Sequence, residues 1–118
     1  MLNDASGFQH VYLCTGYTDL RKGIDGLISI VTGTFGLDPT EAGSIFLFCG
    51  RRNDRMKVLL YEGDGWLLCY KRFTDGKLQW PRSEKEARDL TPQQYRWLME
   101  GLSIEQKKTI SPLKPDLY

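Results

Sequence analysis

The centre of this 118-residue chain alternates hydrophobic and polar residues in the pattern of a β-hairpin. The run Glu62-Gly63-Asp64-Gly65 supplies the turn, because Gly and Asp accept the positive φ angles that hairpin turns need. Centring the turn between Gly63 and Asp64 predicts the register of the two strands. The expected cross-strand pairs are Tyr61 with Trp66, Leu59 with Leu68, Lys57 with Tyr70 and Arg55 with Arg72.

The two faces of this hairpin differ in character, because successive side chains of a strand point in opposite directions. One face is apolar, with Lys71 as its only charge, and suits a core. The other face is cationic and aromatic, and it carries Arg55, Lys57, Tyr61, Trp66, Tyr70 and Arg72. Two interpretations of this second face stay open. It is either a surface for an anionic partner or the polar outer side that any half-buried sheet needs.

Apolar runs on either side of the hairpin predict further strands. Residues 44–49 (SIFLFC) form a continuous apolar run, which is typical of a central strand covered on both faces. We expect a four-stranded antiparallel meander over about 44–49, 55–61, 66–73 and 77–80. Residues 10–14 (HVYLC) form a further short strand that can add to this sheet.

Two helices complete the predicted fold. Thr18 is the expected cap of the first, which ends at the stop signals Gly33 and Gly36. Its apolar stripe consists of Leu20, Ile24, Leu27, Ile28, Val31 and Phe35. The second helix starts with a capping box formed by Thr91 and Gln94, with Pro at the first helical position. Its packing stripe consists of Tyr95, Leu98, Met99 and Leu102.

These elements predict an α+β fold in a single domain, an antiparallel β-meander of four to five strands packed against an N-terminal helix and a C-terminal helix. A chain of 118 residues with 41 % hydrophobic content can bury one modest core, which we place at about residues 10–102. Residues 103–118 are the expected tail, with roughly the last eight mobile. Three scattered cysteines in apolar runs indicate reduced thiols and a cytoplasmic location. We expect no membrane span, because no apolar run approaches about 18 residues, and no secretion signal, because the N-terminus is not a charged segment followed by an apolar one.

Charge is distributed unevenly, although the net charge is only +1. Residues 51–82 hold 8 of the 16 basic residues, whereas residues 1–50 hold 2. An anionic partner responds to such a local excess. A second basic pair, Arg21 and Lys22, falls in the first turn of the predicted N-terminal helix, where cations and free N–H groups together suit a phosphate. The alternative is that Asp19 and Asp25 neutralise this pair.

The spacing of these residues resembles a known family. It shows in Arg51-Arg52-x-Asp54-Arg55-x-Lys57, Gly63-x-Gly65, Tyr70-Lys71-Arg72 and Trp80-Pro81. Further matches are Gly16-x-Thr18-Asp19-Leu20-Arg21-Lys22-x-x-Asp25-Gly26-Leu27, Leu90-Thr91-Pro92 and Glu100-Gly101-Leu102. Over most of residues 10–102 the chain thus resembles the accessory protein of insertion-sequence 66 elements, of the TnpB or second-reading-frame type. Tyr61 stands where that family has Trp, and Trp66 where it usually has Phe, so both departures keep an aromatic ring.

The resemblance implies a non-catalytic accessory protein of a bacterial insertion element, which assists DNA transposition beside a separate transposase that carries the catalytic acids. The implied partners are the element's DNA and that transposase, with no small-molecule substrate and no cofactor. The expected nucleic-acid-binding residues are Arg21, Lys22, Arg51, Arg52, Arg55, Lys57, Trp66, Tyr70, Lys71 and Arg72. If about four to six phosphates are neutralised, log K for duplex DNA falls with log salt at a slope of about −4 to −5.

An adaptor role stays open beside DNA binding. The same Arg and aromatic residues suit a protein–protein adaptor that docks on the transposase without contacting DNA, because interfaces also favour Tyr, Trp and Arg. The sequence leaves the oligomeric state open.

Catalytic chemistry has weak support in the sequence. A small nuclease would use Glu62, Asp64 or His10, yet the two acids fall in a turn and the only histidine falls in a strand pattern. Asp54 lies among arginines and is expected to pair with Arg51, Arg52 or Arg55. No His/Cys/Asp cluster has metal-ligand spacing, and no nucleotide-binding or hydrolase fingerprint occurs. We therefore expect neither an enzyme nor a metal site.

Overall fold

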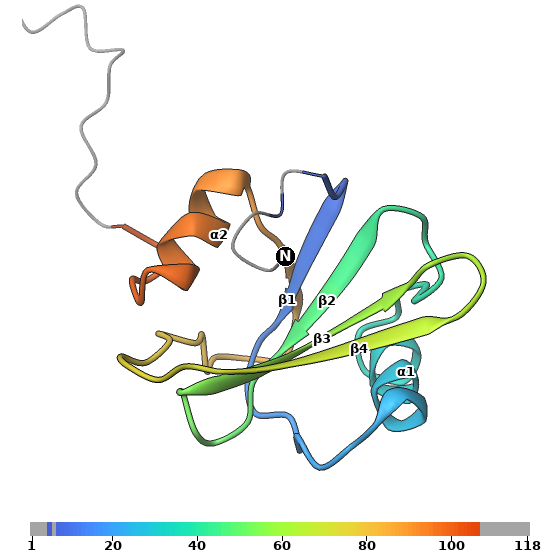
Figure 1. Cartoon of the computed structure of the whole chain (residues 1–118), viewed down its shortest axis with the longest axis horizontal. Coiled ribbons are helices and arrows are strands. Elements are labelled where there is room, and N and C mark those ends of the chain that lie inside the picture. Colours follow the sequence, from blue (N-terminus) through green and yellow to red (C-terminus); the bar gives the residue numbers. More distant parts are fainter. Residues whose placement is uncertain (1–4, 6, 107–118) are drawn as a thin grey trace, which may run out of the picture.

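A five-stranded mixed sheet with one helix on each face forms the body of the computed structural model (Figure 1). The structure describes residue 5 and residues 7–106, so most of the expected tail, residues 107–118, lies outside the described residues. In chain order the elements are β1 (His10–Cys14), α1 (Ile24–Gly33), β2 (Ser44–Phe48), β3 (Arg55–Tyr61), β4 (Trp66–Arg72), β5 (Ala87–Asp89) and α2 (Pro92–Met99). The strands lie in the order β4-β3-β2-β1-β5.

The central hairpin, β3 with β4, has the predicted register. Its pairs include Tyr61 with Trp66 and Arg55 with Arg72. The Glu62 N–H donates to the Gly65 carbonyl at 2.8 Å, and Gly63 has a φ of 92°, a value that favours glycine. The turn chemistry and the alternation of side chains therefore fix this register together.

β2 is the central strand that its apolar run predicts. All five of its residues are buried. Ile45 and Leu47 pack in the core beneath α2, whereas Phe46 and Phe48 pack in the core beneath α1. Strand alternation thus supplies both faces of the sheet from one uninterrupted apolar segment.

The expectation of a purely antiparallel meander is wrong, because β1 pairs with β2 in parallel. His10 stands opposite Ser44, and α1 forms the crossover between the two strands. Parallel neighbours need such a crossover, since no tight turn can join them. The sheet is therefore mixed.

The predicted strand at residues 77–80 is also wrong. Leu78 and Trp80 are buried, but the Leu78 N–H donates to the Asn53 carbonyl at 2.7 Å, and the Trp80 indole N–H donates to the Cys14 carbonyl at 3.0 Å. These bonds lead the chain away from β4 and toward β1. The last strand is instead β5, which pairs antiparallel with β1 and lies in a polar segment where no element was expected.

α1 begins at Ile24, later than the predicted cap at Thr18. The Thr18 N–H donates to the Cys49 carbonyl at 2.9 Å, and the Asp19 carboxylate accepts the Arg21 N–H at 3.0 Å. Asp forms such local turns readily, in competition with a helix. Arg21 and Lys22 therefore lie in a loop before α1 and not in its first turn, while the predicted apolar stripe packs in the core beneath the helix.

α2 has the predicted start and a shorter packing stripe than expected. The Thr91 hydroxyl accepts the Gln94 N–H at 3.1 Å, and the Gln94 side chain accepts the Thr91 N–H at 3.0 Å, which is the capping box. Tyr95 and Leu98 are buried, but Leu102 is 41 % exposed. The helix ends before Leu102 because Gly101 has a φ of 79°.

The three cysteines are free, as expected, with Cys14 and Cys49 buried and Cys69 half-buried. Burial raises the pKa of the Cys14 thiol to about 12. None of the helices among the described residues could cross a bilayer.

Candidate nucleic-acid interface

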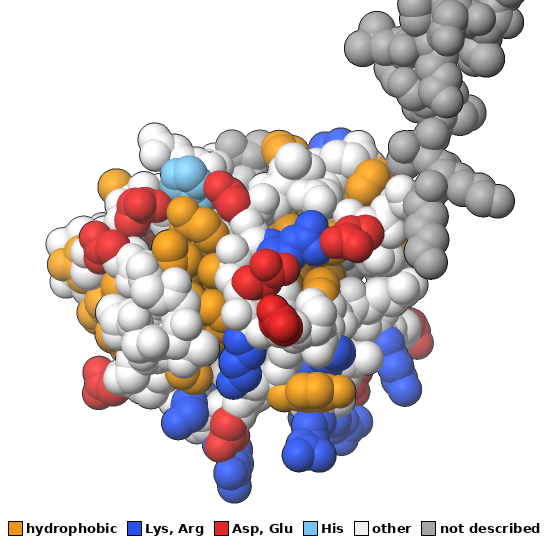
Figure 2. Space-filling view, turned by 180° about the vertical axis from the view of Figure 1, so that it is seen from behind, with side chains coloured by type: hydrophobic (Ala, Val, Ile, Leu, Met, Phe, Trp, Pro, Cys, Tyr) orange, Lys and Arg blue, Asp and Glu red, His pale blue; other side chains and the backbone are white. Residues whose placement is uncertain are grey.

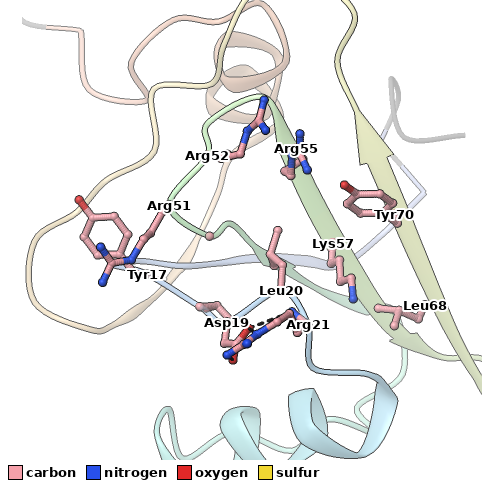
Figure 3. Close-up of a pocket in the computed structure, with 12 residues that line it drawn as sticks. Tyr17, Asp19, Leu20, Arg21, Arg51, Arg52, Arg55, Lys57, Leu68 and Tyr70 are labelled. Carbon is pink, nitrogen blue, oxygen red and sulfur yellow. Dashed lines mark hydrogen bonds and ion pairs between the residues drawn. The ribbon is translucent and has the colours of Figure 1, made fainter.

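A hollow of about 880 Å³ opens at one end of the sheet, on the same side as α1 (Figure 3). We call it the basic groove. It is lined by residues 17–21, residues 50–52, Arg55, Lys57, Leu68 and Tyr70. Residues 17–21 belong to the loop before α1 and residues 50–52 to the loop after β2, and the other four side chains come from β3 and β4.

The hairpin register brings the groove's strand residues together. Lys57 stands opposite Tyr70, and strand alternation turns both toward the α1 side of the sheet, together with Arg55. α1 packs over the other end of this face, against the core that contains Leu59 and Trp66. The helix thus covers the end of the hairpin near its turn and leaves the opposite end open.

Close contact between the two loops shapes the floor of the groove. A Cβ atom on Gly50 would lie 3.1 Å from the Thr18 carbonyl oxygen and 3.2 Å from Leu20 Cγ, so only glycine fits there without a shift. Lys57 Nζ donates to the Lys22 carbonyl at 3.0 Å and ties β3 to the loop before α1. The two loops are therefore packed closely against each other, and the Lys57 side chain holds the first of them against β3.

Arg82 braces the side of the groove at which Tyr17 stands. Its guanidinium donates to the Gly16 carbonyl at 2.8 Å, to Asn53 Oδ1, and to Cys49 Sγ at 3.6 Å. The same guanidinium lies 4.1 Å from the centre of the Tyr17 ring, a cation–π distance. One half-buried arginine thus connects both loops and the Tyr17 ring.

Two carboxylates pair with the groove's arginines: Asp54, as the sequence predicted, and Asp19, which was one of the alternatives left open. Asp19 pairs with Arg21 at 2.9 Å, and hydrogen bonds from Arg21 lower the pKa of Asp19 to about 2. Asp54 pairs with Arg55 at 3.0 Å and with Arg52 at 3.1 Å. The hydrogen bond from Arg55 is the main cause that lowers the pKa of Asp54. Both acids are held in the ionised form.

Positive charge remains in excess after this pairing. Five of the groove's lining residues are Lys or Arg, and two acids pair with them: Asp19 in the lining and Asp54 beside it. Arg51 is exposed and forms no hydrogen bond or ion pair with any other residue that the structure describes. The Arg52 side chain is 70 % exposed although it reaches Asp54. Figure 2, which views the molecule from the side opposite to Figure 1, shows Lys and Arg side chains gathered along the lower part of the surface.

Six of the ten expected binding residues line the groove: Arg21, Arg51, Arg52, Arg55, Lys57 and Tyr70. The other four lie outside the lining. Lys22 is exposed next to it, and Arg72 is exposed at the end of β4, opposite Arg55. Lys71 points to the opposite face of the sheet, with its Nζ 5.2 Å from the Phe73 ring centre. Trp66 packs on Tyr61 with ring centres 4.8 Å apart and against the core beneath α1.

Tyr17 and Arg82 belong to the site but were missed in the sequence. Tyr17 occupies the variable position of the Gly16-x-Thr18 motif, so the motif does not specify a residue there. Arg82 belongs to a polar connection that resembled nothing, and its contact with Gly16 spans 66 positions. The clustering of basic residues in 51–82 was the only signal that included Arg82.

The groove offers two kinds of contact to a ligand. Its cations can bind phosphates or carboxylates. Its two tyrosines, Tyr17 and Tyr70, are 54 % and 52 % exposed, and with Leu102 they are the large hydrophobic side chains that the described surface exposes most. Exposed rings beside cations can stack on the bases of a nucleic acid. The groove therefore has the chemistry of a nucleic-acid interface.

Comparison with known proteins agrees with the spacing of the motifs. The family model described as IS66 Orf2 like protein matches residues 9–109. The chain belongs to this family. The Sinorhizobium fredii (strain NBRC 101917 / NGR234) protein named Uncharacterized protein y4hO is 35 % identical over 92 residues, which cover 78 % of this chain and 79 % of that protein. Uncharacterized protein y4jC of the same strain is 28 % identical over 117 residues, covering 97 % and 98 %. No solved structure matches the chain.

Membership in the IS66 Orf2 like family confirms the resemblance drawn from the motifs and associates the chain with insertion sequences and transposition. The match covers the whole basic groove and also Arg82, which braces it. Among the described residues, no group of three His, Cys, Asp or Glu side chains could hold a metal ion.

Proposed function

We propose that this IS66 Orf2 like protein is a non-catalytic accessory protein that assists transposition by binding the element's DNA in the basic groove. Family membership supports the link to an insertion element. The excess of cations in the groove, five against the two acids that pair with them, is the observation that carries the proposal. Cations gathered in this way neutralise phosphates and release counterions, which is the main source of sequence-independent affinity for DNA.

Arg52 and Arg55, although paired with Asp54, still have free N–H groups that can donate to a phosphate. A guanidinium has five N–H groups, and Asp54 accepts two from Arg55 and one from Arg52. Arg51 keeps its whole guanidinium available to a ligand, since no other described residue binds it. Phosphate contacts position a protein on DNA without reading its sequence, so the expected binding is sensitive to salt and tolerant of sequence.

The two acids that pair with the groove's arginines are not suited to act as general acids. A general acid that works near neutral pH needs a raised pKa. Hydrogen bonds from arginine instead lower the pKa of both Asp19 and Asp54. These carboxylates act as counterions that hold Arg21, Arg52 and Arg55 in place.

The salt dependence of DNA binding tests this proposal. For a labelled duplex carrying the element's ends, log K should fall with log salt at a slope of about −4 to −5. The double variant Arg51→Ala/Arg52→Ala should bind more weakly and reduce the slope by about 2, because two phosphate contacts from exposed side chains are lost. Arg96→Ala is the control, because it removes one positive charge from the protein at a site away from the groove. Arg96 is exposed on α2, on the other side of the sheet, and it hydrogen-bonds to Gln93 at 2.7 Å. Its removal should leave the slope unchanged.

Two outcomes would overturn the proposal. A flat salt response of the wild-type protein would show that its cations do not contact phosphates. A double variant that keeps DNA binding but no longer retains the transposase in a pull-down would assign the groove to the adaptor role. Loss of DNA binding with intact transposase retention is the result that we expect.

A further inference from the structure

We propose that the basic groove binds unpaired nucleotides, with bases stacked on Tyr17 and Tyr70 and phosphates held by the cations between them. This inference rests on the proposed DNA-binding function, because it specifies which form of DNA enters the same site. It assigns a role to Tyr17 and Arg82, which the phosphate contacts alone do not explain.

The two tyrosines are placed as a pair. Figure 3 shows them on opposite sides of the groove, with Arg55 and Lys57 between them. Tyr17 comes from the loop before α1 and Tyr70 from β4, so separate elements supply the two rings. Both side chains stay more than half exposed, at 54 % and 52 %, beside a core that could have buried them.

Each ring has a cation that restrains it. The Arg82 guanidinium lies 4.1 Å from the centre of the Tyr17 ring, and Lys57 Nζ lies 5.9 Å from the centre of the Tyr70 ring. Hydrogen bonds to Gly16 and Asn53 hold Arg82 itself in place. Rings restrained in this way lose little freedom when a base stacks on them, so less of the stacking free energy is lost on binding.

The size of the hollow favours a single strand over a duplex. Its volume of about 880 Å³ lies within the range of about 300–1,000 Å³ in which pockets enclose one drug-sized molecule. A few nucleotides fit inside such a space, whereas a rigid duplex would have to lie across its mouth. Bases inside a duplex are also already stacked on each other, and an exposed ring reaches them only after they leave the helix. Two rings beside a row of cations form the usual arrangement of a single-strand site.

Fluorescence anisotropy with a labelled oligothymidine and a duplex of equal length tests the inference. The full chain should bind the single strand at least about ten-fold more tightly than the duplex. Tyr17→Ala and Tyr70→Ala should each weaken single-strand binding by about 5- to 150-fold, which is 1–3 kcal/mol of stacking at 1.4 kcal/mol per factor of ten. Neither variant should change the slope against salt, because the phosphate contacts remain.

Conservative and control variants separate stacking from folding. Tyr17→Phe and Tyr70→Phe should restore most of the affinity lost in the Ala variants, since Phe keeps the ring. Leu102→Ala, which removes the third exposed hydrophobic side chain at a site away from the groove, should bind like the wild type. Thermal unfolding of each variant shows whether the fold is kept, and both tyrosines are exposed enough for Ala to be tolerated.

The outcomes distinguish this inference from the proposed function. Equal affinity for the two DNA forms, or Ala variants that bind the single strand as the wild type does, would overturn the stacking inference. A steep salt slope in that same experiment would still support phosphate binding by the groove. No salt-dependent binding of either DNA form would overturn both.

Discussion

The two ends of the β3–β4 hairpin present the same face of the sheet to different surroundings. Near the turn, Leu59 and Trp66 pack in the core beneath α1. At the other end, Arg55, Lys57 and Tyr70 line the open basic groove. Strand alternation decides which side chains share the face, and the helix that packs on it decides which of them solvent or a ligand can reach. A strand pattern therefore predicts which side chains share a polar face, but another element can cover part of that face and leave only the rest accessible to a ligand.

The largest effect expected from this comparison is on stability. Leu59→Ala should lower the free energy of unfolding by about 2–5 kcal/mol, because the leucine is fully buried and its removal leaves a cavity. Tyr70→Ala, on the same face at the open end, should change it by about 0.5 kcal/mol or less. Urea unfolding of both variants measures the difference. Similar losses in the two would contradict the division of the face into a covered and an open end.

A smaller effect is expected where the two loops meet at the open end. Gly50→Ala should lower the free energy of unfolding by about 1–3 kcal/mol and weaken DNA binding, because the new Cβ would press on the Thr18 carbonyl at 3.1 Å. Gly33→Ala is the control, since its Cβ would meet nothing within 4 Å. That change lies in α1 and should raise stability by up to about 1 kcal/mol. A Gly50→Ala protein as stable as the wild type would show that the loops adjust freely.

The smallest effect concerns the start of β1, at the opposite end of that strand from Tyr17. The His10 Nδ1–H donates to the Asp89 carboxylate at 2.6 Å, and His10 Nε2 lies 3.8 Å from Glu41 Oε1. The hydrogen bond with Asp89 raises the pKa of His10 above its ordinary value of 6.5. A raised pKa means that the pair contributes fully below pH 6.5 and that its contribution is lost as pH rises through the folded pKa.

Melting temperatures between about pH 5.5 and 8 measure this contribution. The wild type should lose slightly more stability over that interval than His10→Gln, which cannot titrate there. The pH dependence of DNA binding by the groove should be the same in the two proteins. An identical pH response of wild type and variant would mean that the His10–Asp89 pair adds nothing to stability.

Local signals predicted the parts of the fold that are built from neighbouring residues. The hairpin register followed from alternation and from Gly63 in the turn, and the start of α2 followed from Thr91 and Gln94. Parallel pairing of β1 with β2 has no such signal, because the partners of His10 and Val11 lie beyond a helix. β5 has only three residues and no apolar alternation, so its pairing with β1 decides its structure.

The same division applies to the candidate site. Arg55, Lys57 and Tyr70 could be grouped from the sequence, because one hairpin brings them together. Trp66 was expected to be a stacking group, but its position along the strand places it beside α1. Tyr17 entered the site through long-range contacts made by Arg82, which no spacing in the sequence indicates.

The bonds made by Arg82 have a consequence for the order in which the protein is assembled. This side chain joins Gly16 and Asn53, partners 66 and 29 positions earlier in the chain. Synthesis proceeds from the N-terminus, so both loops and the whole central hairpin are synthesised before the residue that braces them. The groove is therefore completed only by a chain translated past Arg82, and a shorter nascent chain carries its cations without the finished hollow.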